Sequence, residues 1–126
     1  MLGILTDPTR SVLVRAMDAR AERNGVIAGN IANADTPGYK RGYVRFEETL
    51  RQMLADGQVE DARAVERLEA TVEQDGSPSS RLDGNNVNID REMGDLARNS
   101  IEYNALVELY RQKGQILRTV ITGGGR

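Results

Sequence analysis

The chain has no cysteine, no histidine and no tryptophan, and each absence narrows what the protein can do. Without cysteine there are no disulfides, no thiolate metal sites and no cysteine nucleophile. Cysteine usage therefore does not indicate whether the protein works in a reducing or an oxidising compartment. Without histidine there is no imidazole base, no Ser-His pair and no His-ligated metal. We therefore predict that the protein is not an enzyme, and that it has no catalytic residues, no metal site and no cofactor.

Large apolar side chains and net charge are also scarce. Of 126 residues, 39% are hydrophobic but only 4% are aromatic, so any compact core would be thin. A net charge of −2 gives no electrostatic footprint for nucleic acid, and no small-molecule substrate is indicated. No run approaches the roughly 18 apolar residues that span a bilayer. The start of the chain lacks the basic segment of a cleaved signal peptide, so composition alone predicts a cytoplasmic protein.

The most informative segment is a run that ends one helix and turns it sharply. Its residues are Asn30, Ile31, Ala32, Asn33, Ala34, Asp35, Thr36, Pro37, Gly38, Tyr39 and Lys40. Pro37 cannot lie in a helix interior and pushes Thr36 out of the helical region, so the helix should end near Ala34 or Asp35. Pro37 and Gly38 fit the central positions of a type II turn, where Gly38 supplies the positive φ.

Two long amphipathic segments flank the rest of the chain. In the first, from about Thr9 to Ala34, an alternating 3,4 stripe contains Leu13, Met17, Ile27 and Ile31. In the second, from about Asp90 to Ile121, a strict 3,4 stripe contains Met93, Leu96, Ser100, Tyr103, Val107, Tyr110, Gly114, Leu117 and Ile121. Asp90 is the expected N-cap. Neither helix can bury its stripe alone. We predict a mainly α fold in which the two helices pair as a coiled coil.

The middle of the chain has a different character. A short helix is expected over Val44–Leu54, and residues 56–75 carry a local net charge of −5. The alternation in Arg67–Glu73 favours a weak strand, although Val65, Leu68 and Val72 also fit a helix. We expect this irregular, partly β region to be mobile or ordered by a partner. The predicted organisation is residues 1–35, 36–89 and 90–126 within one structural domain.

Residues 83–90 look superficially like a calcium loop. An EF-hand loop that begins at Asp83 needs glycine at its sixth position and glutamate at its twelfth, and these positions hold Asn88 and Gly94. The calcium interpretation therefore fails. A turn at Asp83 and Gly84 that leads into the last helix explains the segment more simply.

Two separated blocks carry a resemblance to a known family. The first runs from about Val12 to Leu50 and contains the Asn30–Lys40 motif. The second runs from Leu82 to about Ile121. Both are similar to the bacterial flagellar axial proteins, the rod and hook subunits, and the short length favours the proximal rod over longer relatives. Arg45 departs from the pattern, because an acidic residue is expected there.

The resemblance implies a structural subunit of the flagellar basal-body rod. Such a subunit polymerises with other axial proteins, transmits torque and forms the export channel. Its two terminal helices pair as a coiled coil that lines the inner tube. It also implies synthesis in the cytoplasm and export through the flagellar type III system without a cleaved signal, to a periplasmic rod within the membrane ring. The implied partners are other copies of the chain, the rod proteins FlgC, FlgF and FlgG, the rod-base adaptor FliE, the membrane-ring protein FliF and the export-gate proteins.

Within this interpretation we predict an assembly seam formed by Leu13, Met17, Ile27, Ile31, Met93, Leu96, Tyr103, Val107, Tyr110, Leu117 and Ile121. Leu2, Ile4 and Leu5 are either an export-gate contact or an apolar end that packs in the finished rod. Two alternatives stay open at this point. Instead of a proximal rod subunit of this kind, the chain could be another rod component such as FlgC, or a soluble coiled-coil adaptor or export chaperone.

Overall fold

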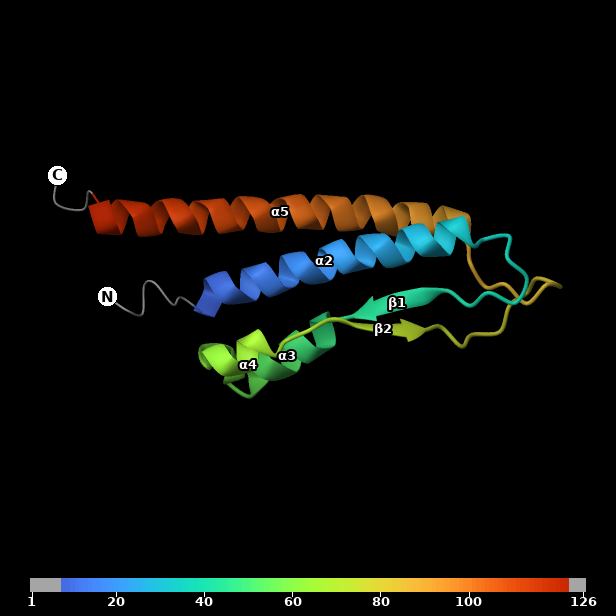
Figure 1. Cartoon of the computed structure of the whole chain (residues 1–126), viewed down its shortest axis with the longest axis horizontal. Helices are drawn as coiled ribbons and strands as arrows, with labels where there is room; N and C mark the ends of the chain where they lie inside the picture. The colour runs from blue at the N-terminus through green and yellow to red at the C-terminus, as the bar shows by residue number, and fades with distance from the viewer. Residues whose placement is uncertain (1–7, 123–126) are drawn as a thin grey trace.

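A computed structural model describes residues 8–122, without the side chains of residues 117, 120 and 121 (Figure 1). The elements in chain order are α2 Pro8–Ala32, β1 Gly42–Arg45, α3 Glu47–Ala55, the 3₁₀ helix η1 Gln58–Glu60, α4 Ala62–Glu66, β2 Thr71–Gln74 and α5 Ile89–Thr122. The molecule is elongated and mainly helical, as predicted. Helix α2 lies between α5 on one side and the β1–α4 segment on the other (Figure 1). None of the helices within residues 8–122 combines the length and the hydropathy of a membrane span.

The two long helices run antiparallel and pack along their length, as the apolar stripes predict. Near the start of α2, the Arg10 guanidinium lies 4.6 Å from the centre of the Tyr110 ring, a cation–π contact. Midway, the Asn99 side chain donates to the Arg20 carbonyl oxygen at 2.7 Å. The predicted bounds of α5 are correct to within one residue.

The cap of α5 differs from the prediction. The Asn88 side chain accepts a hydrogen bond from the Arg91 backbone N–H at 3.2 Å, so Asn88 rather than Asp90 is the N-cap. Asp90 instead lies in the first turn, where its charge suits the positive end of the helix dipole.

Strands β1 and β2 form a two-stranded antiparallel sheet, with Tyr43 opposite Glu73 and Val44 opposite Val72. The outer edge of β1 faces α2. A Cβ on Gly42 would lie 3.2 Å from a Val26 methyl carbon, so this strand begins where only glycine fits without displacing the helix side chain.

The hydrophobic core lies beneath the first half of α2, within the segment we expected to be mobile. Phe46, Met53, Val65 and Leu68 are buried there against Ala19 of α2. The segment is therefore a folded lobe, and its short helix begins at Glu47 because Val44 and Arg45 belong to β1. The helical alternative for Val65, Leu68 and Val72 is correct only for Val65, which lies in α4. The observed strand β2 covers only the end of the predicted range Arg67–Glu73. The start of that range is not strand, because Leu68, just after α4, packs in the core together with Val65 of α4.

Candidate functional site

The motif folds as a helix end followed by a tight turn. Gly38 has φ +73°, and the Tyr39 N–H donates to the Thr36 carbonyl at 3.2 Å, which closes the predicted turn. Helix α2 ends at Ala32, two or three residues earlier than expected. The Gly29 carbonyl near the helix end accepts two bonds from Asn33, from the side-chain amide at 2.8 Å and from the backbone N–H at 3.0 Å.

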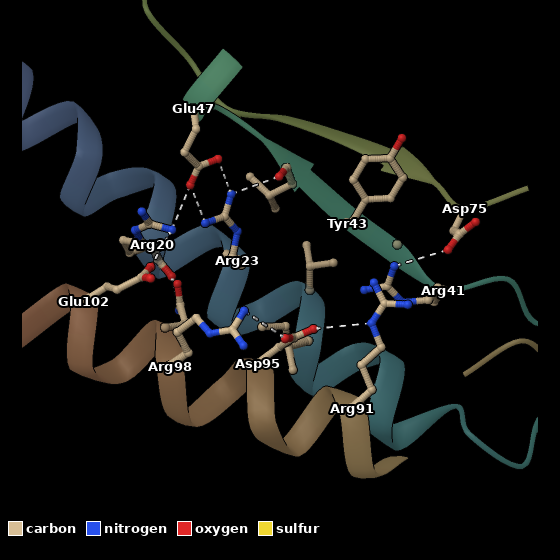
Figure 2. Close-up of a pocket in the computed structure, with 15 residues that line it drawn as sticks. Arg20, Arg23, Arg41, Tyr43, Glu47, Asp75, Arg91, Asp95, Arg98 and Glu102 are labelled. Atoms are coloured by element: carbon tan, nitrogen blue, oxygen red, sulfur yellow. Dashed lines mark hydrogen bonds and ion pairs between the residues drawn. The ribbon is translucent and has the colours of Figure 1, made fainter. Parts of the chain in front are cut away.

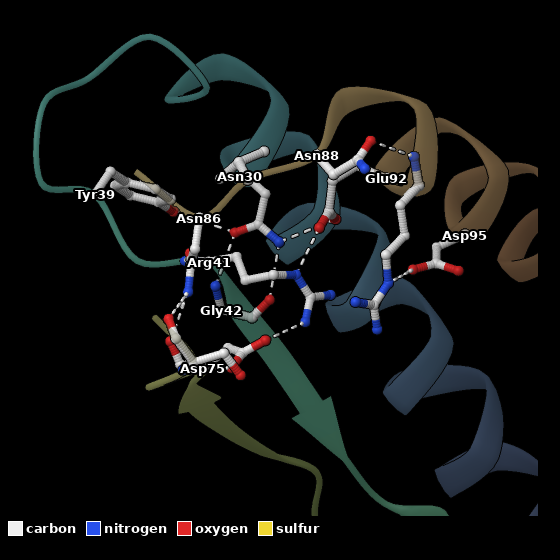
Figure 3. Close-up of polar contacts among 12 residues, drawn as sticks. Asn30, Tyr39, Arg41, Gly42, Asp75, Asn86, Asn88, Glu92 and Asp95 are labelled. Atoms are coloured by element: carbon white, nitrogen blue, oxygen red, sulfur yellow. Dashed lines mark hydrogen bonds and ion pairs between the residues drawn. The ribbon is translucent and has the colours of Figure 1, made fainter. Parts of the chain in front are cut away.

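Asn30 joins α2 to the start of β1, and it is fully buried (Figure 3). Its amide binds both backbone groups of Gly42: the Gly42 N–H donates to Oδ1 at 2.9 Å, and Nδ2 donates to the Gly42 carbonyl at 2.8 Å. The Tyr39 hydroxyl also donates to Oδ1, at 3.3 Å. One asparagine side chain therefore replaces a neighbouring strand along this edge of β1.

Glu92, in the first turn of α5, is the second fully buried group of this cluster. One carboxylate oxygen accepts from Arg41 Nε at 2.7 Å, and the other accepts from Asn30 Nδ2 at 3.1 Å. A buried carboxylate is costly unless it is paired and hydrogen-bonded, and both conditions hold here. Glu92 thus ties α5 to the first residue of the motif and to the residue that follows it.

Arg41 extends the cluster to the strand pair. Its Nη1 lies 3.3 Å from an Asp75 carboxylate oxygen, and its backbone N–H donates to the Asn86 side chain at 2.7 Å. Burial disfavours the charged guanidinium, but the bonds to Glu92 and Asp75 outweigh burial, so the pKa of Arg41 is raised. Bonds from Ser77 and then from Arg41 hold the pKa of Asp75 at about 2.

The second sequence block closes over the motif from outside. The buried Asn85 side chain donates to the carbonyls of Asn33 and Thr36 at 2.8 and 2.9 Å, and so caps the end of α2. The Gly38 N–H donates to the Asp83 carbonyl at 2.7 Å, and Lys40 Nζ donates to the Gly84 carbonyl at 2.7 Å. The two blocks that carry the family resemblance are therefore one structural unit. We call it the polar junction, formed by Asn30, Arg41, Asp75, Asn85, Asn86 and Glu92.

A second charged cluster holds the lobe to both long helices (Figure 2). Glu47, at the start of α3, accepts two bonds from the Arg23 fork at 2.6 and 2.7 Å. Arg20 bridges Glu47 at 2.8 Å and Glu102 of α5 at 2.9 Å. Arg23 also donates to the Val44 carbonyl at 3.0 Å, which covers the edge of β1 next to Asn30. The hydrogen bonds from Arg23 are the main cause that holds the pKa of Glu47 at about 2, below its usual 4.5.

The predicted assembly seam is only partly covered within the chain. Ile27 is buried and Leu13, Met17, Ile31, Leu96, Val107 and Tyr110 are half-buried, whereas Met93 and Tyr103 are 52% and 38% exposed. The face of α5 that turns toward α2 contains Glu92 and Asn99, so it is rotated relative to the predicted stripe. The side chains of Leu117 and Ile121, and Leu2, Ile4 and Leu5, lie outside the described residues. The role of the seam in assembly stays a prediction.

Sequence reasoning missed most of the polar junction. It placed Asn85 and Asn86 only in the segment that leads from the turn at Asp83 and Gly84 to the last helix, and it gave neither Arg41 nor Glu92 a contact with the motif. The available signal was the concentration of asparagine and charge at both helix–loop boundaries, because such residues satisfy the orphan backbone groups there.

Comparisons with known proteins agree on one class. The family model for flagella basal body rod proteins matches residues 11–40, which include most of the first block. Three relatives are named flagellar basal body rod protein FlgB. The one from Bacillus subtilis (strain 168) is 38% identical over 118 residues, covering 89% of this chain and 92% of the relative. That from Escherichia coli (strain K12) is 36% identical and covers 80% and 82%, and that from Salmonella typhimurium (strain LT2) is 30% identical and covers 86% and 89%.

The chain is thus a structural component of the flagellar basal-body rod class. Within that class, it belongs to the FlgB family.

The turn gives a first testable prediction. Gly38→Val should lower the free energy of unfolding by about 1–3 kcal/mol, because a β-branched residue at positive φ is strained. A Cβ at Gly38 would meet no atom within 4 Å, so the loss of stability comes from backbone strain and not from a steric clash. Urea unfolding measures it. Gly76→Val is the matched control, since Gly76 has open space and no positive φ, and equal losses in the two variants would remove the structural role of the turn.

A second prediction concerns acid stability. Glu47 and Asp75 have folded-state pKa values of about 2, below their usual 4.5 and 3.8. A depressed carboxyl pKa adds stability above the unfolded pKa, and this stability is lost as the pH falls through the folded pKa. The urea midpoint should therefore be steady from pH 7 to about 5 and fall between about pH 4.5 and 2. Glu47→Gln should flatten this fall. Glu48→Gln, which removes an exposed partner of Arg51, should leave it in place.

Proposed function

We propose that this chain is a proximal rod subunit that polymerises with copies of itself and with neighbouring axial proteins to form the torque-transmitting rod and its export channel. The observation that carries the proposal is the set of large apolar side chains that α5 leaves in solvent. These are Ile89, Met93, Ile101, Tyr103, Leu109 and Ile116, each between 38% and 70% exposed. Monomeric proteins rarely expose so many along one element, and such surfaces mark protein interfaces.

The polar junction also supports this proposal, because it makes the subunit rigid. It fixes the angle at which the chain leaves α2 and enters α5, so the helix pair and the lobe move as one body. A subunit that transmits torque needs this rigidity, because a loose connection would absorb the rotation. The junction is built from hydrogen bonds and ion pairs within the chain, and it uses none of the exposed apolar side chains of α5, so these can meet partners.

The proposed partners and location follow the family. They are FlgC, FlgF and FlgG, the adaptor FliE, the membrane-ring protein FliF and the export-gate proteins, in a periplasmic rod reached through the flagellar type III system. The test is purification of basal bodies from cells that express the tagged chain, followed by cross-linking. We expect the chain in the rod fraction, cross-linked to rod and ring neighbours. Recovery of a folded chain in the cytoplasm alone would instead support a chaperone.

Leu2, Ile4 and Leu5 give a third prediction. If they contact the export gate, replacing all three with serine should abolish secretion, because the apolar contact is lost before folding begins. Secretion of the tagged variant into the medium of a strain lacking a finished rod measures this. Normal secretion with defective rod assembly would show that these residues pack in the rod instead.

A further inference from the structure

A charged cleft of about 620 Å³ crosses α2 between strand β1 and the first half of α5 (Figure 2). We call it the arginine cleft, because five arginines line it against four acidic residues. Three of the arginines, Arg20, Arg23 and Arg41, each lie 2.6–2.9 Å from a carboxylate oxygen. These three charges are therefore neutralised within the chain.

The other two arginines, Arg91 and Arg98, form the α5 wall of the cleft and share one carboxylate. Their nitrogens lie 3.9 and 3.7 Å from the Asp95 oxygens, beyond hydrogen-bond distance (Figure 2). The two side chains are 62% and 72% exposed. One carboxylate cannot neutralise two guanidinium groups, so this wall keeps a surplus of positive charge. A cleft with a surplus of one sign focuses its field and attracts the opposite charge.

The lobe carries that opposite charge. Residues 47–75 contain nine acidic and three basic residues, a net charge of −6, which leaves +4 for the rest of the chain. Four exposed acidic side chains of the lobe form no ion pair and no hydrogen bond within residues 8–122, and we call them the lobe acids: Asp56, Glu60, Glu66 and Glu69. They lie between the end of α3 and the residues just after α4, on the side of α2 opposite α5 (Figure 1). They therefore do not pair with the arginine cleft of their own chain.

We propose that the arginine cleft receives the lobe acids of a second copy of this chain. The two surfaces have opposite charge, and neither is neutralised in the single chain. Copies that packed lobe against lobe would place like charges side by side, which is unfavourable. A copy that is displaced relative to its neighbour avoids this repulsion, because its lobe then meets a positive surface.

The geometry of this contact fits a rod. Two different surfaces of one chain meet, so the contact is heterologous and can repeat along a filament. The chain supplies both charges, and in the proposed rod its copies lie close together, which favours a second copy over an unrelated acidic partner. The inference rests on the proposed function and adds to it the two surfaces by which copies meet.

Charge reversal tests the contact in a strain that lacks the unmodified chain. Arg91→Glu with Arg98→Glu reverses the cleft wall, and Glu60→Arg with Glu66→Arg reverses part of the lobe. Each double variant places like charges together at the contact, so its incorporation into basal bodies should fall about tenfold or more. A chain with all four changes should recover to within about threefold of the unmodified chain, because its copies are complementary again. All four positions are exposed, so the melting temperatures of the purified variants should not change.

The matched control combines the same lobe reversal with Arg111→Glu and Arg118→Glu. Both arginines are exposed on α5 outside the cleft, and the total charge equals that of the chain with all four changes. This control should stay at the level of the lobe variant. If it recovers as well, net charge rather than this contact decides incorporation, and the inference is overturned. If the chain with all four changes does not recover, the cleft and the lobe do not meet between copies.

The chain has no cysteine, so two single-cysteine variants give an independent measurement. Gly94→Cys marks the cleft wall, since position 94 lies on the same face of α5 as Arg91 and Arg98, and a Cβ there would meet no atom within 4 Å. Ala62→Cys marks the lobe, one helical turn before Glu66. Cells that express both variants are treated with a short bismaleimide, and their basal bodies are isolated. We expect the mixed 62–94 product about tenfold or more above either homodimer, since only the mixed pair meets across the contact.

The control for the cross-link replaces Gly94→Cys with Ala105→Cys, an exposed position about 17 Å farther along α5, and should give no such product. Basal bodies that contain both variants without the mixed 62–94 product overturn the inference and leave the proposed function standing. Capture of a different protein alone by the Gly94→Cys variant overturns the choice of a second copy. Absence of the unmodified chain from basal bodies overturns both the inference and the proposed function.

Discussion

Glu92→Ala should lower the free energy of unfolding by about 3–5 kcal/mol, the cost of removing one partner from a buried ion pair. The Glu92 side chain is fully buried and accepts from Arg41 at 2.7 Å and from Asn30 at 3.1 Å. Its loss leaves the Arg41 guanidinium with only the 3.3 Å contact to Asp75, and removes the Glu92 acceptor from the Asn30 amide. Small domains are stable by about 5–15 kcal/mol, so this loss is a large share of the total. Urea unfolding of the purified chain measures it.

Two controls separate the junction from the helix dipole. Asp90→Ala removes an exposed acidic residue from the same helix turn and should cost less than about 1 kcal/mol. Replacing Arg41 and Glu92 together with leucine should cost less than Glu92→Ala alone, because no unpaired charge stays buried. If Glu92→Ala and Asp90→Ala have equal effects, Glu92 acts through the dipole, and the junction does not hold the fold.

The elements that could be predicted are those specified by local chemistry. The 3,4 spacing of apolar residues predicted both long helices, and the bounds of α5 were correct to one residue. The turn followed from Pro37 and Gly38, because proline fixes one φ angle and glycine permits the other. The turn at Asp83 and Gly84 was predicted from its glycine, and Gly84 has φ +78°.

The polar junction could not be predicted, because each of its residues has an adequate local explanation. A glutamate in a first helical turn suits the dipole, and asparagines in a loop suit a turn. Only the fold places Glu92 against Arg41, 51 residues away in the chain. The rotation of α5 relative to the predicted stripe has a similar cause. Glu92 and Asn99 face α2 because their side chains bond to polar groups there, and the spacing of apolar residues does not reveal such contacts.

The lobe was mispredicted for a compositional reason. Many charges in residues 56–75 indicate a solvated segment, and most of them do lie on its surface. Its few apolar residues are nevertheless spaced so that Val65 and Leu68 meet Phe46 and Met53 from another part of the chain. A small cluster of this kind is stable only against α2, so no local pattern reveals it.

Phe46→Ala should therefore unfold the lobe, with a loss of about 3–5 kcal/mol in the free energy of unfolding. Phe46 is the only phenylalanine in the chain, is 3% exposed and packs in one cluster with Met53, Val65, Leu68 and Ala19 of α2. Truncation loses the transfer free energy of the ring and leaves a cavity that this thin core cannot fill. Urea unfolding measures the loss, and amide hydrogen exchange should show that protection is lost first in α3, α4 and β2.

Leu54→Ala is the matched control, since Leu54 lies in α3, the helix that Phe46 caps, and is 58% exposed. It should change the stability by no more than about 0.5 kcal/mol. If Phe46→Ala and Leu54→Ala are equally mild, the lobe is not held by this cluster. The ion pairs of Glu47 with Arg20 and Arg23 would then have to hold the lobe on α2. That outcome is not expected, because Glu47 is 44% exposed and partly exposed ion pairs contribute about 1 kcal/mol or less.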